Sequence, residues 1–122
     1  MGAKRSIPAV AILLALVLMQ GQAVGGVYYS GKQLVGLMRE FDKSQTDLNS
    51  SWCDVRGYMS YVAGVYDATS GILWDDSAKL PLSQICAIVS KYLKKYPERW
   101  NESAATLVTD ALMEAFPLSK KK

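Results

Sequence analysis

The sequence predicts an all-α protein, a small four-helix bundle-like domain that follows a cleaved N-terminal signal peptide. Two observations lead to this fold class. Apolar residues recur at three- and four-residue steps in four separate segments, which is the spacing of one face of a helix. No segment of useful length alternates between apolar and polar residues as a half-buried strand does. Four such helices with short connections are expected to pack as a bundle.

The N-terminus has the three-part plan of a secretory signal peptide. Lys4 and Arg5 precede an apolar run over residues 7–19, and a short stretch of small and polar residues ends at Ala23. As a helix the run would be about 20 Å long, which is less than the roughly 30 Å of hydrocarbon in a bilayer. We therefore expect residues 1–23 to be removed after export, leaving no permanent membrane span.

Residues 24–122 then form the mature chain, whose 99 residues suit a single helical domain with one core. This chain carries 12 basic and 11 acidic residues, and three of the basic ones form the C-terminal tail, residues 120–122. Nucleic-acid-binding domains usually carry a clear excess of basic residues. The near-neutral balance therefore predicts no nucleic-acid partner.

The first two helices are predicted from a cap residue followed by an apolar face. Ser30 is the candidate cap of the first helix, and residues 49–51 offer a cap for the second and longest one. The two apolar faces consist of Leu34, Leu37, Met38 and Phe41, and of Trp52, Val55, Tyr58, Met59, Val62, Val65 and Tyr66. Because Trp52 is in register with the second face, we expect it in the core.

Two glycines, Gly57 and Gly64, lie seven residues apart in the second helix and therefore nearly on one face. Each costs about 0.5 to 1 kcal/mol relative to alanine inside a helix. Two on one face predict that a neighbouring backbone approaches closely there.

The second half of the chain begins with an aperiodic connection over residues 72–80, followed by two helices. A third helix is predicted from Pro81 to a stop at Pro97. Asn101 is the candidate cap of a fourth, with Glu102 in its first turn. Their apolar faces consist of Ile85, Ile88, Val89, Tyr92 and Leu93, and of Leu107, Val108, Ala111, Leu112 and Ala115.

The chain contains no histidine, which excludes Ser-His-Asp and Cys-His catalysis and the commonest metal ligand. The neighbouring Asp75 and Asp76 lack the spacing of a calcium-binding loop. We therefore expect no catalytic residue, no cofactor and no metal. A small hydrolase that relies on Asp67, Asp75, Asp76 or Asp110 is the least favoured alternative.

Cys53 and Cys86 are the only cysteines, and export would place them in an oxidising compartment. A disulfide between them would close a loop of about 33 residues and stabilise the fold by roughly 3.5 to 4 kcal/mol. The alternative is a pair of buried free thiols that pack as small apolar groups.

From Gly57 onward, the sequence resembles the Rap1a/Tai family of type VI secretion amidase immunity proteins. The resemblance covers roughly the C-terminal half of the chain and depends on the order and spacing of several short pieces. They are Gly57-Tyr58, Gly64-Val65-Tyr66-Asp67-Ala68, Gln84-Ile85, Lys91-Tyr92-Leu93 with Pro97, Ala105, Leu107-Val108, Ala111-Leu112 and Ala115-Phe116-Pro117.

The resemblance implies a periplasmic helical protein, often dimeric, that binds a peptidoglycan amidase effector and blocks its active-site cleft. Proteins of this family frequently have cysteines near the position of Asp75 and directly after the Phe-Pro pair, where this chain has Leu118. Their joint absence suggests that one family disulfide is missing here, with Cys53 and Cys86 as a substitute pair.

Exposure, rather than the family pattern, selects the candidate partner-binding residues. Tryptophan is a favoured interface anchor as well as a core residue, and Trp74 and Trp100 both lie in or beside predicted loops. The predicted contact residues are Trp74, Asp75, Asp76, Ser77, Lys79, Glu98, Arg99 and Trp100. The alternative function is a small periplasmic acid-stress chaperone.

Overall fold

Five helical segments follow one another along residues 28–119, the part of the chain that this computed structural model describes. They are α2 (Gly31–Ser44), α3 (Trp52–Thr69), α4 (Leu82–Lys95), the 3-10 turn η1 (Pro97–Arg99) and α5 (Ala104–Ala115). Over the same residues, β-pairing is limited to two isolated bridges, which confirms the all-α prediction. The expected signal peptide, residues 1–23, and the tail of three lysines lie outside the described residues.

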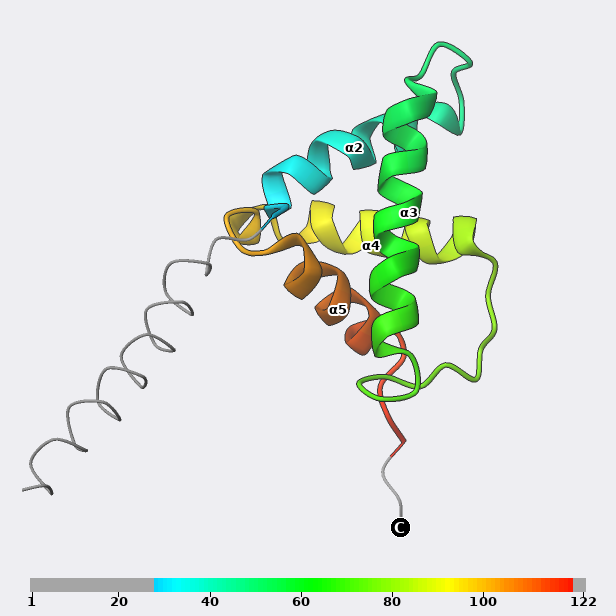
Figure 1. Cartoon of the computed structure of the whole chain (residues 1–122), viewed down its shortest axis with the longest axis vertical. Helices are drawn as coiled ribbons and strands as arrows, with labels where there is room; N and C mark the ends of the chain where they lie inside the picture. The colour runs from blue at the N-terminus through cyan, green and yellow to red at the C-terminus, as the bar shows by residue number, and fades with distance from the viewer. Residues whose placement is uncertain (1–27, 120–122) are drawn as a thin grey trace, which may run out of the picture.

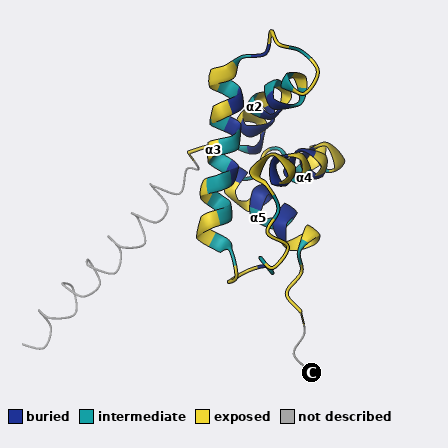
Figure 2. Cartoon of the chain, turned by 90° about the vertical axis from the view of Figure 1, so that its right-hand side faces the viewer, coloured by how far each residue is buried: buried dark blue, intermediate teal, exposed yellow. Residues whose placement is uncertain are grey.

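The four α-helices surround one hydrophobic core (Figure 1). Each of the four α-helices contacts the other three, and the longest helix, α3, makes its most extensive contact with α2. In the view of Figure 1, α4 crosses behind α3, while α2 lies above α4 and α5 below it. Figure 2 shows the buried residues of the helices turned toward one another. The largest fully buried side chains are Trp74, Tyr58, Leu34, Met38, Ile85, Leu93, Leu107 and Leu112.

Local hydrogen bonds explain where the first two helices begin. The Ser30 hydroxyl accepts from the backbone N–H of Gln33 at 3.3 Å, and the Gln33 side chain accepts from the Ser30 N–H at 2.9 Å. This is a capping box, which satisfies two backbone donors that the helix itself leaves unpaired. Ser51 caps α3 by accepting from the N–H of Asp54. The predicted starts of both helices are confirmed.

The predicted cap of the last helix is wrong, because α5 begins later than expected. Its cap is Ser103, whose hydroxyl accepts from the N–H of Thr106, and not Asn101. The turn η1 and the residues after it occupy the intervening stretch. Glu102 therefore lies before the helix, where it pairs with Arg99 instead of interacting with the first turn.

The close backbone approach predicted at Gly57 and Gly64 is also wrong. A Cβ atom at Gly64 would meet no heavy atom within 4 Å, and one at Gly57 would meet only the Leu37 side chain, at 3.7 Å. The close approach occurs at Gly31 instead, where a Cβ would lie 2.6 Å from the carbonyl oxygen of Trp100. The Gly31 N–H also donates to Glu102 O at 2.8 Å, so the start of α2 packs against the turn that precedes α5.

Trp52 lies outside the core, contrary to its periodicity, with 60% of its surface exposed. It is the first residue of α3, and the first buried residue of that helix is Val55. The first turn of α3 therefore extends beyond the helices that would cover it. Helical register gives the direction of a side chain but does not show whether a neighbour reaches that level.

The two cysteines are free thiols, so the predicted disulfide is absent from this structure. Cys53 is exposed on the first turn of α3, whereas Cys86 is fully buried in α4. The residue of α3 that reaches Cys86 is Tyr58, whose hydroxyl donates to the Cys86 carbonyl oxygen at 2.7 Å. Tyr58 lies five residues, or about 7.5 Å along the helix, beyond Cys53 and on another face. The alternative of two buried thiols holds for Cys86 alone.

Thiol labelling should distinguish the two cysteines. We expect a maleimide to modify Cys53 in the folded protein and to modify Cys86 only after unfolding. Burial excludes the reagent from Cys86 and raises the pKa of its thiol to about 12, so little nucleophilic thiolate forms. Mass spectrometry without reductant should show one adduct in buffer and two in denaturant. A protein that takes up no label in denaturant until it is reduced would instead contain the disulfide.

Candidate partner-binding surface

The connection between α3 and α4, residues 70–81, is built around a buried tryptophan. Trp74 is only 1% exposed, and its indole N–H donates to the Thr69 hydroxyl at 2.7 Å. Its ring meets Tyr66 edge-on with 4.5 Å between ring centres and lies 5.7 Å from the ring of Phe116. The structure therefore places Trp74 in the core as the anchor of the connection, and not on the surface where the sequence reasoning placed it.

Further hydrogen bonds fix the connection on both sides of Trp74. The backbone N–H of Asp75 donates to Phe116 O at 2.9 Å, which ties the connection to the end of α5. The Asp75 carboxylate accepts from the N–H of Ser77 at 2.9 Å, and hydrogen bonding to Ser77 lowers the pKa of Asp75. Asp76 accepts from the Ser70 hydroxyl at 2.7 Å. Both carboxylates thus help to fix the backbone, and each remains only partly exposed.

The exposed side chains of this connection are the polar Ser77 and Lys79, the large apolar Ile72 and Leu73, and the smaller Ala78 and Pro81. Sequence reasoning identified the first two and missed the two large apolar residues, of which Ile72 is 70% and Leu73 42% exposed. Adjacent large apolar side chains held out in water are typical of a protein-binding surface. Their position directly after a helix end was the available signal, but an aperiodic segment does not show which side chains point outward.

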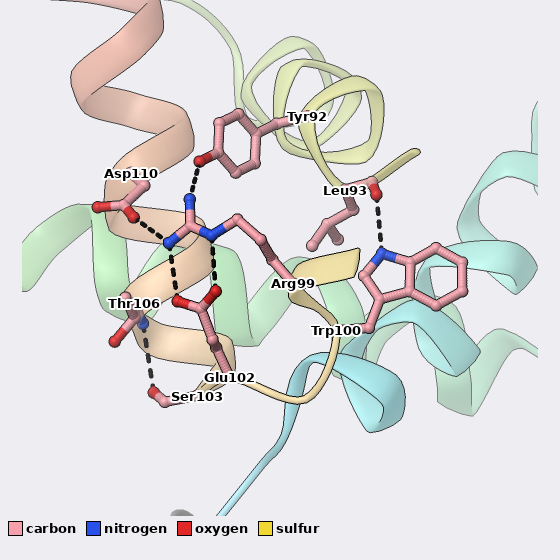
Figure 3. Close-up of polar contacts among 8 residues, drawn as sticks. All are labelled: Tyr92, Leu93, Arg99, Trp100, Glu102, Ser103, Thr106 and Asp110. Atoms are coloured by element: carbon pink, nitrogen blue, oxygen red, sulfur yellow. Dashed lines mark hydrogen bonds and ion pairs between the residues drawn. The ribbon is translucent and has the colours of Figure 1, made fainter. Parts of the chain in front are cut away.

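The second predicted contact segment, residues 98–100, contains a network centred on Arg99 (Figure 3). The Arg99 guanidinium donates to both carboxylate oxygens of Glu102, at 2.7 and 2.8 Å, and to Asp110 at 2.6 Å. A third contact joins it to the hydroxyl of Tyr92. Arg99 is therefore engaged in linking α4, η1 and α5, and its side chain is only partly exposed.

The contribution of this network to stability depends on pH. Hydrogen bonds to Glu102 and Asp110 raise the pKa of Arg99, and the hydrogen bond from Arg99 lowers the pKa of Glu102. Because the pKa of Glu102 is lower in the folded than in the unfolded chain, its contribution to stability is complete above the unfolded pKa. That contribution is lost as the pH falls through the folded pKa.

Trp100 also has mainly a structural role. Its indole N–H donates to the backbone oxygen of Leu93 at 2.8 Å, and the guanidinium of Arg39 lies 5.6 Å from the centre of its ring (Figure 3 shows the hydrogen bond). Of the three predicted residues in this segment, Glu98 is exposed, whereas Arg99 and Trp100 are only partly exposed. Figure 1 places residues 97–100 and residues 70–81 on opposite sides of the molecule, so the predicted residues do not form one patch.

The carboxylates of the hydrolase alternative lie in different settings, and Asp67 is exposed in the last turn of α3. Asp110 is held in the Arg99 network, whereas Asp75 and Asp76 lie in the α3–α4 connection. Within residues 28–119, no three acidic or cysteine side chains come together in a way that would hold a metal ion.

None of the helices within residues 28–119 has both the length and the apolar character needed to cross a membrane.

The described residues thus define a small all-helical protein whose polar groups mainly hold its fold and whose α3–α4 connection displays apolar side chains. A comparison with family models matches residues 30–118, well over half of the chain, to the family described as Rap1a immunity proteins. The chain therefore belongs to the Rap1a immunity protein family, which indicates an immunity role exerted by binding a partner effector. No curated protein matches the chain. The acid-stress chaperone alternative gains no support.

Proposed function

We propose that this protein is the immunity partner of a type VI secretion peptidoglycan amidase and that it binds and blocks the active-site cleft of that enzyme. Peptidoglycan lies in the periplasm, which is where the expected signal peptide would deliver the chain. The proposal also includes the homodimer that the family resemblance implies, which light scattering of the purified protein would test.

The observation that supports this function best is that the firmly held α3–α4 connection displays two large apolar side chains, Ile72 and Leu73. The buried Trp74 ring, the backbone hydrogen bond from Asp75 to Phe116 and the side-chain hydrogen bond from Ser70 to Asp76 hold the segment. Little conformational entropy is therefore lost when a partner binds it. Enzyme clefts are concave and largely apolar, and they accept protruding apolar groups. Ile72 and Leu73 are the large exposed apolar groups that this segment offers.

The test uses the peptidoglycan amidase encoded beside the gene for this chain. We expect the wild-type protein to form a complex with the catalytically inactive amidase and to stop peptidoglycan hydrolysis by the active one. Ile72→Asp should weaken binding at least tenfold, because it would bury an unpaired charge in the interface.

The matched control is Leu48→Asp, which changes another exposed apolar residue in the α2–α3 connection. Neither substitution should lower the melting temperature, because neither side chain is in the core. The absence of a complex between the wild-type protein and any neighbouring amidase would refute the proposed function. Equal effects of Ile72→Asp and Leu48→Asp would refute the role of the connection.

A further inference from the structure

A shallow apolar pocket opens beside the α3–α4 connection, between the second half of α3 and the first turn of α4. Its volume is about 230 Å³. It is lined by Ala63, Tyr66, Asp67, Leu80, Leu82 and Ile85. Asp67 is the only charged residue of the lining, and its side chain is exposed. Among residues 28–119, Asp67 makes neither an ion pair nor a side-chain hydrogen bond.

The charge of Asp67 lies where the fold itself disfavours a negative charge. Asp67 is in the last turn of α3, and the C-terminal end of a helix carries the negative end of the helix dipole. That turn contains no basic residue. Residues 67–81 hold three aspartates and one lysine, Lys79, and no ion pair of the described residues involves any of the four. The pocket thus opens beside a segment with more negative than positive side chains and next to the negative end of the α3 dipole.

We propose that this pocket receives an arginine or lysine side chain of the amidase. The aliphatic part of that side chain would lie against the apolar walls, and its cationic group would pair with Asp67, as long basic side chains do where an apolar surface ends in a polar rim. The choice of a cationic occupant follows from the charge of the pocket and of the helix end. The inference rests on the proposed function and identifies the chemistry of one contact with the amidase.

The test compares two substitutions that each remove one negative charge from α3. Asp67→Asn should weaken binding to the inactive amidase roughly 30-fold or more, the effect of removing one partner of a desolvated ion pair. Asp54→Asn, at the other end of the same helix and about 20 Å away, should leave the affinity within about twofold. Isothermal titration at two salt concentrations should also show a weaker salt dependence for Asp67→Asn than for wild type.

A charge reversal identifies the partner residue. Asp67→Lys should abolish binding, and changing one arginine or lysine of the amidase to aspartate should restore it. Equal affinities of wild type and Asp67→Asn, with Ile72→Asp still impaired, would overturn the cationic contact and leave the proposed function intact. If the wild-type protein bound no amidase, the function and this inference would fail together. Circular dichroism melts should show that the Asp67 variants fold like wild type, since this side chain has no partner in the fold.

Discussion

Replacing Trp74 with alanine should lower the free energy of unfolding by about 3 to 5 kcal/mol, the range found when a large buried aromatic side chain is truncated. Trp74 is almost fully buried between Tyr66 and Phe116, and its indole N–H bonds to Thr69. The substitution would leave a cavity under the α3–α4 connection. Urea denaturation followed by circular dichroism measures the change, and a shift below 1 kcal/mol would contradict this role of Trp74.

The matched control for Trp74→Ala is Trp52→Ala. Trp52 is exposed on the first turn of α3, so its removal should change stability by less than about 0.5 kcal/mol. Because Trp74 anchors the 70–81 connection, Trp74→Ala should also reduce inhibition of the amidase under conditions where the variant is still folded. Trp52→Ala should leave inhibition unchanged.

Two glycine substitutions should change stability in opposite directions. Gly31→Ala should destabilise the protein by about 1 to 3 kcal/mol, because the added methyl group would overlap the backbone of Trp100 and the side chain of Leu107. The overlap would also disturb the hydrogen bonds that join the start of α2 to the turn before α5. Thermal denaturation of the purified variant provides the measurement.

The comparison variant is Gly64→Ala, which places the same methyl group inside α3 where no atom lies within 4 Å. It should raise the free energy of unfolding by about 0.5 to 1 kcal/mol, because alanine is the better helix former. Destabilisation by Gly64→Ala would contradict the open space at Gly64, and an unchanged stability of Gly31→Ala would contradict the close backbone approach at Gly31.

The features that the sequence predicted correctly are those that depend on neighbours in the chain. The capping box of Ser30 and Gln33 involves residues three apart, and the apolar faces of the helices follow from a fixed period. The burial of Trp74 depends instead on Phe116, more than forty residues later, and an aperiodic segment contains no signal for such a contact. The predicted burial of Trp52 was wrong for the converse reason. Its helical register was correct, but no neighbouring helix covers it.

The candidate site was predicted only in part for the same reason. Ser77, Lys79 and Glu98 are exposed as expected, because polar residues in connections usually are. Arg99 was predicted to be an exposed contact residue, but its partner Asp110 is eleven residues away on α5 and becomes a neighbour only after the helices pack. The pocket beside Asp67 has walls from three segments, so no local pattern of sequence could have indicated it.

The hydrogen bond between Asp75 and Phe116, together with the burial of Trp74, also bears on how the protein can evolve. These contacts hold the connection through its backbone and through one buried ring. The outward-facing positions, 72, 73, 77 and 79, lie on both sides of the anchored positions 74 to 76 and are exposed. Substitutions at such exposed positions usually change stability little. In the proposed complex, selection can therefore exchange the outward residues to follow changes in the effector, while the scaffold that displays them remains the same.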